Sequence, residues 1–255
     1  MRYLLKAAVF SVVTACCFCG ILRGQETEKK PEKQRKNIIR YDLSGSLLFG
    51  INRYYVFGYE RVIGRHQSFS FNFGGAGLPK LVSFNTDSFN LKKDLKNNGF
   101  NFSIDYRFYL ANENKYDAPH GLYVGPYFSM NHFHRDNTWS YQKAGAAEQL
   151  ITTETSFTIY TLGAELGYQF ILWKRVALDL VMIGPGISNY DLTSKIKNDL
   201  TDAQKQQLQK GITQLITQKF PGMNYVLSDK QLDANGDLKT WNFGYRYIIH
   251  VGFLF

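Results

Sequence analysis

The end of the chain shows a strict alternation of large apolar residues with small or polar ones. Within residues 241–255 the large apolar positions are Trp241, Phe243, Tyr245, Tyr247, Ile249, Val251, Phe253 and Phe255. A period of two predicts a β-strand with one apolar face and one mixed face. Strands in soluble domains run about five or six residues, whereas a strand that crosses a bilayer needs about 9–11. The pattern therefore favours a membrane-spanning strand.

The same alternation recurs in seven segments before the last one. The predicted strands begin near residues 39, 55, 69, 100, 122, 160 and 176, and the first of them covers 39–49. The intervening turns and loops are predicted at about 50–52, 62–65, 78–98, 112–120, 135–153, 173–174 and 188–239. Long and short connections alternate after the first one, which is unusually short for an outer loop. The eight strands predict an all-β, eight-stranded antiparallel up-and-down transmembrane β-barrel over residues 38–255.

The last long connection, 188–239, contains a predicted helix at about 202–219. Thr201 and Gln204 have the spacing of a capping box, and Leu208 and Ile212 follow at helical spacing. Pro221 is expected to end the helix. We expect this fourth outer loop to pack its helix over the mouth of the barrel; a partner-binding helix is the alternative.

The opposite face of the predicted strands carries charged residues of both signs. If the apolar face meets lipid, these residues line the interior, and they are Arg40, Asp42, Glu60, Asp105, Arg107, Glu165, Asp179, Arg246 and His250. An isolated buried charge is very costly, so we expect them to pair. Side chains can fill the space inside eight strands. The prediction is an internal charge network that closes the lumen, with a narrow water path as the alternative.

The N-terminus has the pattern of a secretory signal. Arg2 and Lys6 precede an apolar run that continues to residue 22, which predicts a signal peptide over 1–24. Its removal would take the net charge from +9 to +6, since three basic residues and no acidic ones are lost. Residues 25–37 are predicted to be a charged flexible leader. A lipid anchor at Cys16 is the alternative.

Composition narrows the class of protein further. Aromatic residues make up 16% of the chain, which is typical of a protein that presents aromatic surface to lipid, whereas a mean hydropathy of −0.28 argues against a bundle of membrane helices. All three cysteines lie within the predicted signal peptide, so no disulfide is expected in the mature chain. The basic charge is not accompanied by a nucleic-acid-binding motif.

The signal, the eight strands and the terminal phenylalanine together resemble the small eight-stranded outer-membrane β-barrels of Gram-negative bacteria, of OmpA or OmpX type. The segment LLFGINRYYVFGYERVIGRHQSFSFNFG resembles a group of uncharacterised barrels in which a YERxxG-type hairpin, here Tyr59–Gly64, joins the second and third strands. The resemblance implies a bacterial outer-membrane location and contact with outer-membrane lipid. It also implies recognition of Phe255 and Phe253 by the barrel-assembly machinery. It carries no activity.

Candidate chemistry is limited to polar residues near strand ends. His132, Ser156 and Glu154 are of the types that acyl-chain-editing enzymes use, yet their spacing matches no enzyme motif. His132, His134 and Asp136 are potential metal ligands, but interface histidines explain them more simply. Asp233 to Asp237 resembles half of a calcium loop, and a plain turn is favoured. We therefore expect no metal, no other cofactor and no catalytic activity.

The sequence thus favours a structural or surface-interaction protein that presents its long loops to an extracellular partner. The alternatives are an enzyme that edits the acyl chains of outer-membrane lipid, and a narrow channel or carrier for small solutes. A soluble lipocalin-like barrel is the main architectural rival, and it would turn its apolar face inward.

Overall fold

The structure, a computed structural model, describes residues 35–77, 89–141, 148–198, 200–219, 232–233 and 236–255. The side chains of residues 89–96 and 215–219 are not among the features described. The predicted signal peptide, most of the predicted leader, the lipid anchor at Cys16 and the helix stop at Pro221 lie outside these residues.

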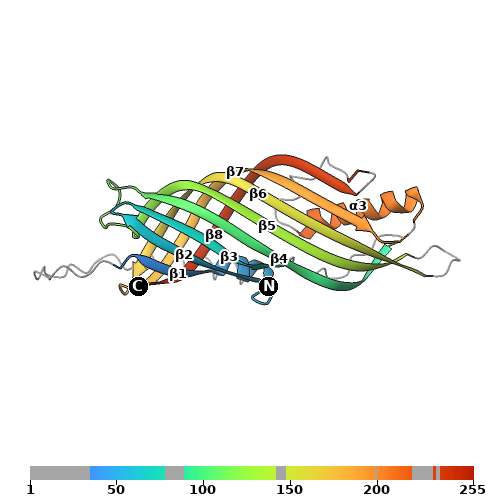
Figure 1. The fold of residues 1–255 in the computed structure, drawn as a ribbon, viewed down its shortest axis with the longest axis horizontal. Helices are drawn as coiled ribbons and strands as arrows, with labels where there is room; N and C mark the ends of the chain where they lie inside the picture. The colour runs from blue at the N-terminus through green and yellow to red at the C-terminus, as the bar shows by residue number, and fades with distance from the viewer. Residues whose placement is uncertain (1–34, 78–88, 142–147, 199, 220–231, 234–235) are drawn as a thin grey trace, which may run out of the picture. The chain divides into compact units, whose positions relative to one another are not determined.

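Eight antiparallel strands pair in sequence order, and the last strand pairs with the first to close a ring (Figure 1). The predicted all-β, up-and-down arrangement of eight strands is confirmed. The strands are β1 (Asn37–Asp42), β2 (Tyr54–Gly64), β3 (Gln67–Ala76), β4 (Phe89–Tyr109), β5 (Gly121–Tyr141), β6 (Gln149–Leu172), β7 (Val176–Ile196) and β8 (Asp237–Leu254). Asn37 thus belongs to β1, one residue before the predicted start of the barrel.

The first strand is shorter than predicted because its second half is a helix, α2 (Leu43–Phe49). The Asp42 carboxylate accepts hydrogen bonds from the Gly45 amide at 2.9 Å and the Ser44 hydroxyl at 2.8 Å. Such a local cap offers the backbone an alternative to strand pairing. A Cβ on Gly45 would lie 2.1 Å from the Tyr54 ring, so glycine allows the helix to pack against β2. The prediction of a strand over 39–49 was wrong from residue 43 onward.

Several predicted loops are also shorter than expected, because the strands continue into them. β4 begins at Phe89, inside the predicted loop 78–98. β5 and β6 extend through most of the predicted loop 135–153, and β7 and β8 shorten the loop 188–239 to 197–236. The helix in this last loop, α3 (Asp202–Lys219), has the predicted bounds. Proline in a strand can mark a bulge, because it cannot donate to the ladder. Pro126 of β5 causes no such shift, since the pairs Asp105–Tyr127 and Phe108–Val124 on either side of it keep the same β4–β5 register.

Outward side chains change from apolar to polar at a common level on neighbouring strands. His132, Thr158, Asp191 and Lys239 are successive cross-strand partners on β5, β6, β7 and β8. Two residues further along, the corresponding positions are occupied by Met130, Tyr160 and Trp241, and on β7 by the buried Asn189. On β6 the apolar outward residues then continue at alternate positions from Tyr160 to Leu172, a span of 13 residues. We call this zone the apolar band.

Beyond the apolar band, β4 to β8 continue without β1, β2 and β3, and we call this part the extension (Figure 1). Its concave face carries a buried apolar cluster beside buried polar side chains such as Arg135, Asn137 and Thr153. The buried cluster there includes Phe133, Trp139, Ile151, Phe157 and Leu192, together with Leu208 and Ile212 of α3. The helix thus covers the core of the extension. Among the described helices, none is long and apolar enough to cross a membrane.

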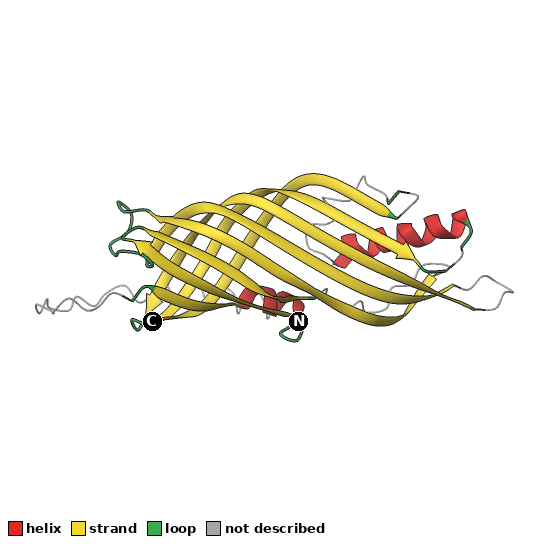
Figure 2. Ribbon diagram, in the orientation of Figure 1, coloured by secondary structure: helices red, strands yellow, loops and turns green. Residues whose placement is uncertain are grey.

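The ring wall contains one helical patch, formed by α2. Within the described residues β1 pairs with β8 only up to Asp42–His250, so the preceding part of β8 pairs with β7 alone. The Ser44 hydroxyl of α2 accepts a hydrogen bond from the Ile249 amide of β8 at 3.2 Å. Leu47 and Leu48 are exposed on this patch. Figure 2 shows α2 midway along the strands and α3 at their far end.

Candidate functional sites

The interior of the ring contains a dense cluster of ion pairs, which we call the charge network. Its arginines are Arg40, Arg107 and Arg246, contributed by β1, β4 and β8. They contact four carboxylates, those of Glu60, Asp105, Glu165 and Asp179. The structure therefore brings together residues from six strands that the sequence assigned to one interior.

Arg107 lies at the centre of the charge network. Its guanidinium is 2.9 Å from the Asp179 carboxylate, 3.3 Å from Asp105 and 3.5 Å from Glu60. Arg40 reaches the same three carboxylates at 3.2 to 3.5 Å. Each guanidinium shares several acceptors, so the loss of one leaves several buried carboxylates without compensation.

Two tyrosine rings pack against the arginines from the β5 side. The Arg246 guanidinium lies 3.8 Å from the centre of the Tyr127 ring, and that of Arg107 lies 4.3 Å from the Tyr123 ring. Space for these rings comes from glycines on β6. A Cβ on Gly163 would meet Tyr127 at 2.7 Å, and one on Gly167 would meet Tyr123 at 2.3 Å. Replacing either glycine would push a ring off its cation.

His250 and Asp42 are placed differently from each other. The His250 Nδ1 lies 3.0 Å from the Asp179 carboxylate, so this histidine joins the charge network. Asp42 is buried but caps α2 and accepts a hydrogen bond from the Tyr54 hydroxyl at 3.0 Å. Of the nine residues expected to pair inside the ring, Asp42 is therefore the one that the described contacts assign to another task.

Sequence reasoning missed the uncharged members of the charge network. The Tyr109 hydroxyl donates to Glu60 at 3.0 Å, the Tyr123 hydroxyl donates to Asp179 at 2.7 Å, and Arg107 donates to Gln169 at 2.9 Å. All three side chains have the inward parity of their strands. Their inward parity could have predicted this role, but the prediction considered charged residues alone.

A cavity of about 210 Å³ lies between α2 and β8, next to the charge network. Its inner wall is polar and its outer rim is apolar. The inner residues include Asn72, Asn101, Ser103, Ser129 and Asn131, and the rim residues include Leu48, Phe49, Tyr245, Tyr247 and Ile248. The cavity thus combines hydrogen-bonding groups inside with an apolar margin at the helical patch.

The candidate catalytic residues lie on the outward face of the extension. The His132 Nδ1 is 2.9 Å from the Thr158 hydroxyl, and the strand register places Ser156 opposite His134. Glu154 contacts His134 and Lys197. The described contacts therefore do not join His132, Ser156 and Glu154 into a nucleophile, base and acid.

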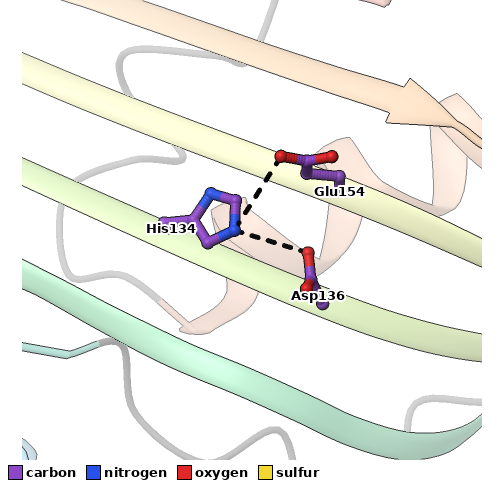
Figure 3. Close-up of side chains that lie close together, drawn as sticks. All are labelled: His134, Asp136 and Glu154. Atoms are coloured by element: carbon purple, nitrogen blue, oxygen red, sulfur yellow. Dashed lines mark ion pairs between the residues drawn. The ribbon is translucent and has the colours of Figure 1, made fainter.

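A different group forms at the same place, from His134 and Asp136 of β5 and Glu154 of β6 (Figure 3). We call it the His–Asp–Glu cluster. The His134 Nε2 lies 3.4 Å from Asp136 Oδ1 and 3.9 Å from Glu154 Oε1. Lys197 hydrogen-bonds to Glu154 and lowers the pKa of this carboxyl below its usual value. The Lys197 ammonium thus helps to hold the Glu154 carboxylate of the cluster in place.

The terminal phenylalanines lie at the end of the ring opposite the extension. Phe253 is outward and half-exposed, with the Arg175 guanidinium 5.5 Å from its ring centre. The Phe255 backbone pairs with Asn37 through hydrogen bonds of 2.8 and 3.1 Å, which extends the closing β1–β8 pair to the last residue. Both side chains are accessible.

No family model, no curated protein and no solved structure matches this chain.

Proposed function

We propose that this protein is an outer-membrane β-barrel with a closed lumen, and that it has a structural or surface-interaction role carried by its extension. The observation that carries the proposal is the inversion of polarity along the strands. In the apolar band, outward residues are apolar and inward residues are polar or charged. In the extension, outward residues are mostly polar, and the inward face carries a buried apolar cluster together with buried polar residues such as Arg135 and Asn137. Lipid around the first zone and water around the second would account for both arrangements.

The dimensions of the apolar band support this proposal. A tilted strand needs about 9–11 residues to cross the hydrocarbon core, and the apolar outward run of β6 spans 13 residues, which is enough to cross it. Tyr160 and Trp241 are found at its border with the extension, where aromatic girdles of such barrels occur. The connections at the opposite end are short, at 65–66, 110–120 and 173–175, as periplasmic turns are.

A non-conducting role follows from the interior. The charge network fills the cross-section with arginine and tyrosine side chains that are paired with carboxylates. Charges held in such pairs leave no continuous aqueous path of the kind that wide barrels have. The extension is then the part of the molecule that an extracellular partner can reach. Within the membrane, the partners of the protein are lipid, around the apolar band, and the assembly machinery. No catalytic role is part of this proposal.

Fractionation and electrophoresis test the location and the fold together. The native protein should be extracted from outer membranes with detergent, and its migration should shift on heating, as that of a stable membrane barrel does. In planar bilayers the purified protein should give no conductance steps. Recovery as a soluble monomer would contradict the membrane proposal, and regular conductance steps would contradict the closed lumen.

A second candidate function, carriage of a small amphiphilic molecule, is favoured by the cavity beside α2. Its polar inner wall and apolar rim suit a molecule with a polar head and an apolar tail. A fluorescent fatty acid should bind the detergent-solubilised protein. Ser129→Phe should block binding because the ring would fill the cavity, whereas Ser156→Phe, on the outward face of β6, should not. Equal binding by both variants would remove this candidate.

A further inference from the structure

The His–Asp–Glu cluster combines one imidazole and two carboxylates on adjacent strands outside the apolar band. His134 and Asp136 are two residues apart on β5 and therefore share a face. Glu154 is the direct cross-strand partner of Asp136. All three side chains are partly exposed, so an ion from solvent can reach them. Figure 3 shows the imidazole turned toward both carboxylates.

The donor atoms are spaced for a small divalent metal ion. Zn²⁺ binds imidazole nitrogen at about 2.0–2.1 Å and carboxylate oxygen at about 2.0–2.2 Å, which puts neighbouring donors roughly 3.4 Å apart in a tetrahedral site. His134 Nε2 and Asp136 Oδ1 have this separation, at 3.4 Å. One donor atom from each residue lies within 4.8 Å of the other two. Small rotations of Glu154 would complete the site.

One carboxylate oxygen of the cluster lacks a hydrogen-bond donor, although lysines lie on the neighbouring strands. Two carboxylates directly opposite each other on neighbouring strands repel. Lys197 relieves one of them, because its ammonium is 3.2 Å from Glu154 Oε2 and leaves Oε1 toward His134. In contrast, Asp136 Oδ1 is buried and has no hydrogen-bond donor in the described structure. The backbone register also places Lys195 opposite Glu154 and Lys96 opposite Asp136.

We propose that His134, Asp136 and Glu154 bind a zinc-class divalent cation with three protein ligands. An imidazole nitrogen favours Zn²⁺ and its transition-metal neighbours over Mg²⁺ and Ca²⁺, which prefer all-oxygen sites. Three protein ligands leave at least one coordination position for water or for a group from another molecule. The ion would join β5 to β6 just beyond the apolar band.

The site differs from the one that the sequence suggested. Sequence reasoning grouped His132 with His134 and Asp136, since all three share one strand face. In the structure His132 contacts Thr158 instead, and the third ligand comes from β6. His132 is therefore a matched control on the same strand and the same face, two residues from His134.

Titration of the detergent-solubilised full chain with Co²⁺ and Zn²⁺ tests the proposal. The wild-type protein should bind one equivalent with a visible Co²⁺ spectrum of nitrogen and oxygen ligation, and Zn²⁺ should displace it. His134→Gln, Asp136→Asn and Glu154→Gln should each weaken Zn²⁺ binding by about tenfold or more. His132→Gln should leave the affinity unchanged. Heat-shifted migration on gels checks that every variant is folded.

Two outcomes would overturn the proposal. One is a wild-type protein that binds no Co²⁺ or Zn²⁺ at millimolar concentration. The other is an equal loss in His132→Gln and His134→Gln with no loss in Glu154→Gln, since this would place the ion on one strand. The cysteines at 16, 17 and 19 are common to all variants, and their thiolate bands distinguish any metal that they hold from metal in the cluster.

Discussion

The apolar band and the extension share strands β4 to β8, yet the apolar side chains lie mainly on the outer face in the first and on the inner face in the second. On β6 the outward residue Leu162 is 67% exposed, and the inward residue Glu165 is buried among arginines. Further along the same strand, Phe157 points inward and is buried, while Glu154 points outward. The alternation itself does not slip. What changes is which parity carries the apolar side chains, and the proposed change of medium outside the wall, from lipid to water, would account for it.

The comparison also separates two ways of filling the same kind of space. Inside the apolar band, buried ion pairs and tyrosines occupy the ring, and such pairs stabilise only while every charge keeps its partners. Inside the extension, an apolar core is completed by α3, and its stability follows from burial and packing. The first filling should therefore be intolerant of single deletions, and the second should respond in proportion to the volume removed.

The largest effect is expected from Arg107→Met, which breaks the charge network at its centre. The change leaves Asp179, Asp105 and Glu60 with reduced compensation in a buried site, which costs about 3–5 kcal/mol. The loss in free energy of unfolding is measured by urea unfolding in detergent, with the heat-dependent gel shift as the probe of folded protein. Arg65→Met is the control, because its side chain is 79% exposed and pairs with Asp117 at the surface, where a pair is worth about 0–1 kcal/mol.

A loss of about 3 kcal/mol is expected from Leu208→Ala, and it should be confined to the extension. Leu208 is 1% exposed and joins α3 to the apolar core. Protease should then cleave the connection between β7 and β8 more readily, while the gel shift of the ring is kept. Gln206→Ala, on the exposed side of α3, is the matched control. A ring that unfolds together with the extension would show that the two regions are one cooperative unit.

Leu162→Arg tests whether lipid surrounds the apolar band. A charge on the lipid face costs about 2 kcal/mol, less near the interface than at the bilayer midplane. In water the same exposed position would tolerate arginine with little change. Refolding into lipid vesicles at a series of urea concentrations gives the difference in free energy of unfolding between the variant and the wild-type protein. Ser156→Arg, on the same face of β6 within the extension, should be neutral; equal effects of both changes would argue against a membrane boundary between them.

The ring was predictable from sequence because apolar outward residues such as Phe69, Phe71 and Phe73 repeat every two positions in a long run. The extension was not, because its outward residues are polar and the same rule then indicates a loop. Apolar residues of inward parity, such as Phe133 and Phe157, were the signal for it. A rule that lets the apolar face of a strand change from outward to inward along its length would have turned that signal into a prediction.

Helix α2 and the His–Asp–Glu cluster escaped prediction for a different reason. The run from Leu43 to Phe49 alternates like a strand, and what makes it a helix is the Asp42 cap together with packing on Tyr54. In the same way Glu154 meets His134 only through the register of β5 with β6. Cross-strand partners depend on how far each strand continues toward its turn, and the predicted loop 135–153 left Asp136 outside the paired strands. By contrast, the charged interior followed from parity alone.

The smallest effect is expected at the start of α3, from Thr201→Ala. The Gln204 side-chain oxygen accepts from the Thr201 amide at 3.0 Å, and the Thr201 hydroxyl accepts from the Gln204 amide at 3.4 Å, so the predicted capping box is formed. Loss of such a cap costs about 1 kcal/mol. Hydrogen exchange should therefore accelerate in the first turn of α3 and remain unchanged in the ring. Thr201→Ser, which keeps the hydroxyl, should restore protection. Faster exchange in β6 as well would mean that α3 stabilises the extension through its first turn and not only through Leu208 and Ile212.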